Sequence, residues 1–319
     1  MQPTRRAVID VGTNSIKLLV ADVIGHEVRP VLEESKQTRL GRGFYETHRL
    51  QPQVIADTAR AVAEFADTAR DQNATSIRVF ATSAARDARN PEELTTAIGE
   101  LSGLRVEIIS GEREAAWAFK GVTTDPALAR EPLLLLDVGG GSTEFIVGQA
   151  DRMQFSASFP LGTVRLLENL SHSDPPKAEE LSACRKWVRD FLQKEVRPQL
   201  ERALKSNSRT QKTPFQHRLV GTGGTATILG RMETQLTGYD REKIEAVRLS
   251  VERLHWHVEH LWSLPLETRK QIVGLPPNRA DVILMGAAVY EAILDEFGFP
   301  ELRISTRGLR FAAVMESTD

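Results

Sequence analysis

Hydrophobic and polar positions follow two alternating periods along this chain, and these predict alternating strands and helices. Short apolar runs indicate strands, whereas apolar residues three or four apart indicate helices. Strands are expected at 7–12, 15–23, 27–38, 77–83, 106–110, 132–139, 143–150, 153–162 and 302–306. Helices are expected at 52–70, 90–101, 112–122, 177–204, 250–262, 279–297 and 308–317, and residues 218–230 fit a strand, a glycine loop and a helix. Such alternation is typical of a mixed sheet flanked by helices.

The pattern starts twice, which predicts two similar α/β halves. Aligning Asp10 with Asp137, an offset of 137 − 10 = 127 residues, brings two short hairpins into register. The pairs that then coincide are Val11 with Val138, Gly12 with Gly139, and Ser15 with Ser142. We expect an N-terminal lobe over 1–123 and a C-terminal lobe over 124–306. The last helix, about 307–319, is a candidate to pack back onto the first lobe.

Bulk composition excludes several classes of protein. The 319 residues carry a net charge of −2, which disfavours a nucleic-acid partner. The single cysteine, Cys184, can build neither a disulfide framework nor a cysteine-rich metal site. No apolar run reaches the length of a membrane span, so no membrane partner and a cytoplasmic location are expected.

The stretch DVGGGSTE at 137–144 follows an apolar strand and suggests phosphate binding. Rossmann turns and P-loops place such glycines between a strand and a helix. Here Phe145, Ile146 and Val147 predict a second strand instead, and no P-loop pattern occurs anywhere in the chain. The glycines therefore belong to a hairpin turn whose N–H groups can converge on phosphate. An ordinary hairpin with a glycine turn remains the alternative.

Eight segments together resemble the exopolyphosphatase/guanosine pentaphosphate phosphohydrolase family over nearly the full length, in its short two-domain form. They are VIDVGTNSIKLLV (8–20), TRLGRG (38–43), ATSAARDARN (81–90), ISGEREA (109–115), LLDVGGGSTEFIVG (135–148), GTGGTAT (221–227), GLPPNRADVILMGAAV (274–289) and STRGLR (305–310). The resemblance implies an α/β fold of the actin-like ATPase superfamily, ribonuclease H-like and duplicated, with a cleft between two domains.

The resemblance also implies catalytic residues. Glu114 matches the family's catalytic glutamate, and Arg86 matches an arginine that clamps phosphate. Each has an ordinary alternative. Acids are common in the first turn of a helix, which would account for Glu112 and Glu114 as a pair. Arg86 would pair at the surface with Asp87 or Glu92.

The two hairpins and the later glycine loop supply the candidate binding residues. A divalent cation, Mg²⁺, would be held by Asp137 and Glu144. The GTGGTA loop at 221–226 either holds a distant part of the substrate or is merely a tight junction between strand and helix. The expected phosphate-binding residues are Asp10, Gly12, Thr13, Asn14, Ser15, Gly139, Gly140, Gly141, Ser142, Thr143, Gly221, Thr222, Gly223 and Gly224.

The function that follows is hydrolysis of the terminal phosphate of inorganic polyphosphate with Mg²⁺. Guanosine pentaphosphate (pppGpp) is the alternative substrate. A small-molecule kinase of the actin-like superfamily and a non-catalytic sensor are more distant alternatives, and a homodimer is plausible from the family.

Two other features have ordinary interpretations. His255, His257 and His260 face different sides of one helix, so a packing helix is expected in place of a metal site. The basic stretch 205–218 is interpreted as an exposed loop.

Overall fold

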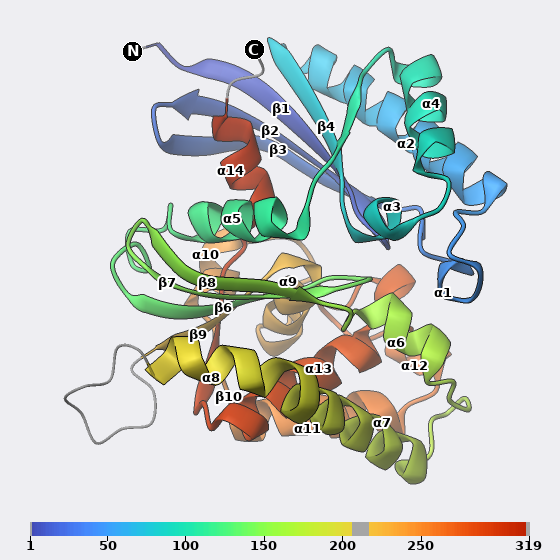
Figure 1. Cartoon of the computed structure of the whole chain (residues 1–319), viewed down its shortest axis with the longest axis vertical. Coiled ribbons are helices and arrows are strands. Elements are labelled where there is room, and N and C mark those ends of the chain that lie inside the picture. The colour runs from blue at the N-terminus through green and yellow to red at the C-terminus, as the bar shows by residue number, and fades with distance from the viewer. Residues whose placement is uncertain (1, 206–216, 317–319) are drawn as a thin grey trace. The chain divides into compact units, whose positions relative to one another are not determined.

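The structure is a computed structural model that describes residues 2–205 and 217–316. It divides into two compact units (Figure 1). The first unit comprises Met1–Pro126, Gly139–Gly141 and Arg307–Asp319, and the second comprises Ala127–Val138 and Ser142–Thr306. In the described ranges, no helix is both long and apolar enough to cross a bilayer.

The sheet of the first unit has five strands in the order β3-β2-β1-β4-β5. The first three form antiparallel pairs, while β4 runs parallel to β1 and β5 parallel to β4. Their bounds are β1 (Thr4–Val11), β2 (Ser15–Ile24), β3 (Glu27–Gln37), β4 (Ser76–Ala81) and β5 (Val106–Ile108). Strands β1 and β2 form the first of the two predicted hairpins, and its turn contains Thr13 and Asn14.

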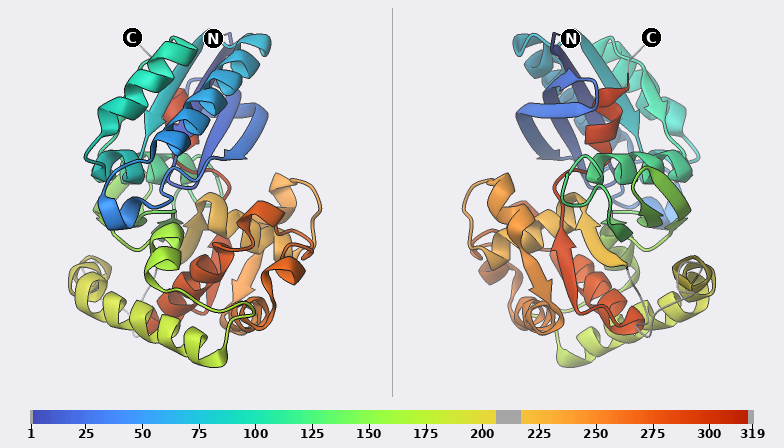
Figure 2. Two further views of the ribbon diagram at one scale, coloured as in Figure 1. Left: turned by 90° about the vertical axis from the view of Figure 1, so that its right-hand side faces the viewer. Right: turned by 90° about the vertical axis from the view of Figure 1, so that its left-hand side faces the viewer.

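Alternating residues of these strands are buried on both faces of the sheet, because helices cover each face (Figure 2). Ile9 packs with α2 (Pro52–Asp71) and α4 (Pro91–Ser102). Val8, on the opposite face, packs with α5 (Gly111–Val122) and α14 (Leu309–Met315). Two short helices complete the unit: α1 (Phe44–Thr47) and α3 (Ser83–Asp87). The chain therefore returns to its first unit at the end.

The sheet of the second unit has six strands in the order β10-β11-β9-β6-β7-β8. Strands β11, β9 and β6 run parallel, whereas β7, β8 and β10 pair antiparallel with their neighbours. Their bounds are β6 (Pro132–Val138), β7 (Thr143–Gln149), β8 (Arg152–Phe159), β9 (Arg218–Thr222), β10 (Arg248–Ser250) and β11 (Glu301–Ile304). The second predicted hairpin, β6–β7, is thus confirmed.

The helices of the second unit pack around one long core. Helix α13 (Ile283–Phe297) is buried along most of its length, which explains its nearly continuous apolar sequence. The remaining helices are α6 (Thr163–Asn169), α7 (Ala178–Phe191), the π-helix η1 (Leu192–Val196), α8 (Arg197–Lys205), α9 (Gly223–Glu233), α10 (Arg241–Ala246), α11 (Val251–Ser263), α12 (Leu266–Arg269) and the 3₁₀-helix η2 (Pro277–Arg279).

Three details of the sequence prediction are wrong. The helix expected at 177–204 contains a π-helical turn between α7 and α8. The strand expected at 77–83 ends at Ala81, and helix α3 begins two residues later. Gly223 and Gly224 form the first turn of α9 and not a loop before it. Most of the basic stretch, 206–216, lies outside the described residues.

Close contact between α5 and the segment before α14 leads to a prediction about stability. A Cβ atom at Gly121 would lie 2.1 Å from the Gly308 carbonyl oxygen. We expect Gly121→Ala to lower the free energy of unfolding by about 1–3 kcal/mol, because α14 must move to make room. Thermal unfolding of the variant and the wild type measures the loss.

Gly99 in α4 provides the matched control, because its nearest neighbour to an added Cβ is 3.8 Å away. Gly99→Ala should leave the unfolding free energy unchanged or raise it by up to about 1 kcal/mol, since alanine favours helix more than glycine does. Equal effects of the two substitutions would contradict the proposed contact.

Candidate functional site

The turn of the first hairpin is buried, which is unusual for a hairpin turn. Thr13, Asn14 and Ser15 are all buried. The Gly12 N–H donates to the Ser15 carbonyl at 3.1 Å and closes the turn. A neighbouring loop covers it: the Gly41 N–H donates to the Thr13 carbonyl at 2.8 Å, and the N–H of Arg39 to the Asn14 carbonyl at 3.0 Å. The loop thus satisfies the backbone of the turn, which is built into the unit and is no solvent-exposed connection.

Four polar side-chain atoms around this turn lack hydrogen-bond partners among the described residues. They are Asn14 Nδ2, Ser15 Oγ, Thr38 Oγ1 and Ser83 Oγ, and all four are buried. An unsatisfied buried donor costs about 1–3 kcal/mol, so a group of them calls for an explanation. A ligand with several acceptor oxygens, such as a phosphate, would satisfy them.

The glycine turn Gly139–Gly141 belongs to the first unit by its contacts. A Cβ at Gly140 would lie 3.0 Å from Thr13 Cβ, and one at Gly141 would lie 2.5 Å from Ser83 Oγ. Gly140 and Gly141 therefore require glycine, because Thr13 and Ser83 would clash with any added Cβ atom. Within the first unit, the structure brings Gly140 and Gly141 together with Thr13.

Glu114 is buried in the first turn of α5, with 8% of its surface exposed. Its Oε2 accepts a hydrogen bond from Arg86 Nη1 at 2.9 Å, and the same Nη1 donates to the Ile109 carbonyl at 3.2 Å. Arg86 is carried by α3, and this helix is tied to the first hairpin because the Ala84 N–H donates to Thr13 Oγ1 at 3.2 Å. The two predicted catalytic residues are thus an ion pair. The alternative partner Asp87 lies farther away, at 3.8 Å from Arg86 Nε.

Glu112 and Glu114 have different environments, although both lie at the start of α5. Glu112 is exposed, and hydrogen bonds from its own backbone N–H and from Ser110 lower its pKa. It therefore fits the ordinary helix-terminus interpretation. Glu114 is buried against an arginine, and the helix-terminus interpretation does not account for that.

Asp10 is the last but one residue of β1, beside the first turn, and it is buried. Burial raises its pKa above the ordinary value, because the charged carboxylate loses hydration; the positive charges of Lys17 and Arg310 partly oppose this. The folded protein therefore disfavours the charged form of Asp10, compared with an exposed aspartate.

In the second unit, Asp137 and Glu144 are directly opposite each other on β6 and β7. They are 7% and 1% exposed, so Glu144 is not the exposed strand residue that an ordinary interpretation would require. Glu144 Oε1 accepts hydrogen bonds from Ser142 Oγ and Ser158 Oγ, both at 2.8 Å. Thr143 donates its hydroxyl to the Leu161 carbonyl and is fully buried. Like charges opposite each other destabilise a sheet, and a bound cation would relieve the repulsion.

The GTGGTA segment is a direct junction between β9 and α9, with no loop between them, and it lies against Asp137. A Cβ at Gly223 would be 2.2 Å from Asp137 Oδ1, and Gly223 has a φ of +83°, so only glycine fits here. Gly221 similarly leaves room for Tyr290, whose hydroxyl donates to the Thr222 carbonyl at 3.4 Å. Burial and the charge of Asp137 raise the pKa of Tyr290, which therefore stays protonated.

The sequence does not predict roles for Thr38, Ser83, Ser158 and Tyr290. Thr38 and Ser83 lie within the segments TRLGRG and ATSAARDARN, in which the family resemblance indicates a chemical role for Arg86 alone. Nothing in the sequence distinguishes Ser158 or Tyr290 from ordinary strand and helix residues. Their importance arises from contacts with Glu144 and with the β9–α9 junction.

The three histidines of α11 have separate partners. His255 pairs with Asp295 and His257 with Glu233, while His260 stacks on Trp256. Across the part of the chain that the structure describes, no three histidine, cysteine or acidic side chains form a metal-binding group.

The match to known proteins extends along nearly the whole chain. Residues 19–318 match the sequence profile of the Ppx/GppA phosphatase family. The chain belongs to this family. It is 35% identical over 318 residues to exopolyphosphatase 2 of Mycobacterium tuberculosis, covering 96% of each protein. It is 27% identical to a guanosine-5'-triphosphate,3'-diphosphate pyrophosphatase of Vibrio parahaemolyticus, covering 98% of this chain and 59% of that protein.

Solved structures agree with the assignment. The Ppx/GppA family member of Aquifex aeolicus matches with a TM-score of 0.78 and 28% identity, covering 98% of this chain and 97% of that one. The predicted family, the α/β fold class and the enzyme class, a phosphoric anhydride hydrolase, are confirmed.

The raised pKa of Asp10 leads to a prediction about the pH dependence of stability. Because the folded pKa lies above the unfolded one, the folded state loses stability as pH rises from the ordinary aspartate pKa, about 4, through the folded value. Asp10→Asn removes this loss. The variant should therefore gain thermal stability relative to the wild type as pH rises, with the gain levelling off above the folded pKa. Unfolding midpoints from pH 4 to 8, measured with EDTA present, give the difference.

Asp22 on β2 is the control with the opposite sign. A hydrogen bond from Arg5 lowers its pKa, so the stabilisation it gives is present above the ordinary aspartate pKa and lost on acidification. Asp22→Asn should therefore be less stable than the wild type by a nearly constant amount from pH 4 to 8, without the pH-dependent gain expected of Asp10→Asn. An Asp10→Asn variant that is destabilised at pH 8 would contradict the assigned environment.

Proposed function

We propose that this enzyme is an exopolyphosphatase that releases the terminal phosphate of inorganic polyphosphate with Mg²⁺. The main supporting observation is that the pair of Arg86 with the buried Glu114 is anchored, through α3, to a turn surrounded by unsatisfied donors. A carboxylate, a guanidinium and several hydroxyl or amide donors are the groups that phosphoryl transfer to water requires.

Binding of phosphate begins at the first hairpin turn in this proposal. Asn14 Nδ2, Ser15 Oγ and Ser83 Oγ donate to phosphate oxygens, since each lacks another acceptor among the described residues. The glycine turn Gly139–Gly141 adds backbone N–H groups. The hydroxyl of Ser142 donates its single proton to Glu144 Oε1, so Ser142 is not counted among the phosphate donors. The desolvation cost of these donors is thus recovered when substrate binds.

Glu114 acts as the general base. Its carboxylate takes a proton from a water molecule, whose oxygen attacks the terminal phosphorus as the bridging P–O bond breaks. The shortened polyphosphate leaves with the electrons of that bond, and one orthophosphate is produced for each water consumed. In the absence of substrate, Arg86 neutralises Glu114; a phosphate that binds the guanidinium competes for it and makes the carboxylate available to water.

Asp137 and Glu144 fit a magnesium site by their donor chemistry, since both are carboxylates at directly opposed positions of adjacent strands. Glu144 accepts two serine hydroxyl groups on Oε1, from Ser142 and Ser158, and so orients Ser142. Bound Mg²⁺ would neutralise negative charge on the phosphate oxygens.

Polyphosphate is favoured over pppGpp because the relative of matching length, covered over 96% of both proteins, is an exopolyphosphatase. The relative that acts on guanosine 5'-triphosphate 3'-diphosphate is more distant, and this chain covers 59% of it. Release of orthophosphate from polyphosphates of graded length and from pppGpp, in parallel with Mg²⁺ or EDTA, tests the choice. Release from pppGpp alone would overturn the substrate, and release from neither would overturn the hydrolase.

The role of Glu114 leads to a direct prediction. Glu114→Gln should lower kcat by roughly 10²–10⁴-fold without unfolding the protein, because a carboxamide cannot accept the proton of water. Glu112→Gln is the matched control on the same helical turn and should retain kcat within a few-fold. Orthophosphate release under saturating polyphosphate measures both.

Arg86→Lys keeps the charge but loses the planar fork, so we expect a fall in kcat of roughly tenfold or more.

If Glu114→Gln retained full phosphate transfer to an acceptor such as ADP, the kinase alternative would replace hydrolysis.

A further inference from the structure

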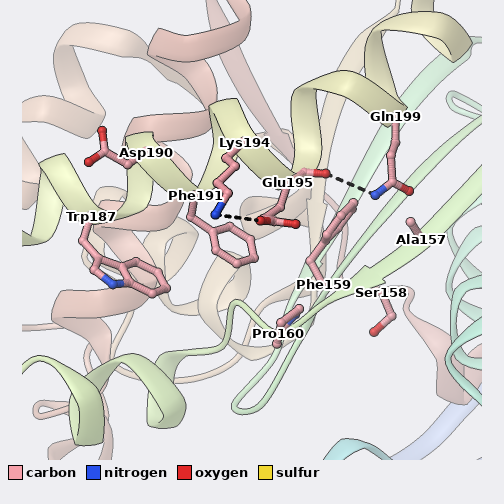
Figure 3. A pocket seen from close by; sticks show the side chains of 10 residues that line it. All are labelled: Ala157, Ser158, Phe159, Pro160, Trp187, Asp190, Phe191, Lys194, Glu195 and Gln199. Carbon is pink, nitrogen blue, oxygen red and sulfur yellow. Dashed lines mark hydrogen bonds and ion pairs between the residues drawn. The ribbon is translucent and has the colours of Figure 1, made fainter.

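A cavity of about 480 Å³ lies in the second unit, between the end of β8 and the helical segment α7–η1–α8 (Figure 3). Its volume falls within the range of roughly 300–1,000 Å³ that is typical of small-ligand sites. Phe159 and Ser158 line it from the strand, and Trp187, Phe191 and Lys194 line it from the helices. All of its lining residues belong to the second unit, and none is among the predicted site residues.

The π-helical turn η1 explains how one helical segment presents so many side chains to this cavity. Trp187, Phe191, Glu195 and Gln199 recur every four residues and all line it. In an uninterrupted α-helix, twelve residues turn the side-chain direction by about 120°, so Gln199 would point away from Trp187. One wide turn at Leu192–Val196 removes most of this rotation. Single π-turns are rare and frequently mark functional sites.

The aromatic walls are arranged by packing before any ligand binds. Trp187 and Phe191 stack with their rings 5.5 Å apart and nearly parallel, at 11°. Phe159 meets Phe191 edge-on at 6.5 Å and is itself fixed against Phe145 at 5.4 Å. Trp187 and Phe191 are nevertheless partly exposed. The cavity thus offers preformed π-surfaces to a planar group.

The aromatic faces select the sign of the ligand. Asp190 and Glu195 contribute two negative charges at the rim, and Lys194 contributes one positive charge. Each acid has a lysine partner: Lys186 Nζ is 2.5 Å from Asp190, and Lys194 Nζ is 3.8 Å from Glu195. All four side chains are exposed, so these pairs leave little net field at the rim. Aromatic faces attract cations, which favours a ligand that joins an aromatic ring to an ammonium group.

A ligand here would contact the candidate phosphate hairpin through two residues of β8. Ser158 lines the cavity and donates its hydroxyl to Glu144 Oε1 at 2.8 Å. Phe159 lines it as well and pairs in register with Thr143. A shift of either residue would move the side chains that orient Ser142.

The geometry points to this cavity as an effector site for a small aromatic cation, which acts on the hairpin β6–β7 through Ser158 and Phe159. The effect of the ligand on the hairpin β6–β7 rests on the proposed function, whereas the binding of the ligand to the cavity does not.

Three probes that share one ring system test the binding: 1-naphthylmethylamine, 1-naphthalenemethanol and 1-naphthylacetate. We expect affinity for the full-length protein, measured by isothermal titration calorimetry, to fall from the cation to the neutral alcohol to the anion. The cation should bind at least roughly fivefold more tightly than the anion. Equal or tighter binding of the anion, or no binding of any probe, would overturn the site.

Variants locate the binding. Trp187→Leu keeps an apolar side chain but removes the π-face, and should lower the affinity for the cation roughly tenfold. Glu195→Gln should reduce the difference in affinity between the cation and the anion, and should leave the affinity for the alcohol unchanged. Ser182→Ala is the control: it lies on the same helix outside the cavity and should leave all three affinities unchanged. Circular dichroism checks folding, and loss of affinity in Ser182→Ala alone would place the ligand elsewhere.

The coupling has its own readout. The cation should change kcat for polyphosphate in the wild type at the concentrations that saturate calorimetric binding. In Ser158→Ala the cation should still bind, but its effect on kcat relative to that variant's own basal rate should shrink. Binding without any kinetic effect on an active wild type would overturn the coupling alone, whereas an inactive wild type would count against the proposed function and not against the binding site.

Discussion

Burial of the first hairpin turn is the constraint on which the rest of the site depends. A turn placed inside a protein must have its polar groups satisfied, because an unmet donor costs more than a hydrogen bond usually returns. The loop at 38–43 satisfies the backbone carbonyls of Thr13 and Asn14. It leaves the side chains of Asn14, Ser15 and Thr38 without acceptors within the described residues. The protein therefore retains a polar, preformed cradle, and stability is lower than an apolar turn would give.

The position of the proposed base follows from that turn. Thr13 Oγ1 accepts a hydrogen bond from the N–H of Ala84, and this bond attaches the short helix α3 to the turn. Arg86 extends from this helix to Glu114 on α5, and α5 is held in turn by α14, which returns from the end of the chain. A carboxylate carried by one helix is thus placed by contacts from segments about 100 and 200 residues away in sequence. This arrangement accounts for the close fit between Gly121 and Gly308.

Sequence patterns predict the repeated framework of this fold, because strand alternation and tight turns are local properties. The hairpins β1–β2 and β6–β7 follow from apolar runs around Thr13–Asn14 and Gly139–Gly141. Helices of four to seven residues, such as α3, α6 and α12, are set by tertiary contacts and show no periodicity of their own. The pairing of Arg86 with Glu114 also required three dimensions, since the motifs gave both residues but not their contact. Tyr290 is another such case, because an apolar helix sequence does not reveal that its hydroxyl lies beneath Gly221.

The π-turn shows how a departure from regular structure can be interpreted. A continuous α-helix over 178–205 would keep regular backbone hydrogen bonds throughout. The wide turn at Leu192–Val196 departs from that pattern, so contacts elsewhere must compensate for its cost. Those contacts are the Trp187–Phe191 stack and its edge-on contact with Phe159. Phe159 is adjacent to Ser158, which in turn binds Glu144. The last two residues of β8 therefore contact both the irregular helix and the acidic hairpin β6–β7. A displacement of this strand end would alter the contacts on both sides.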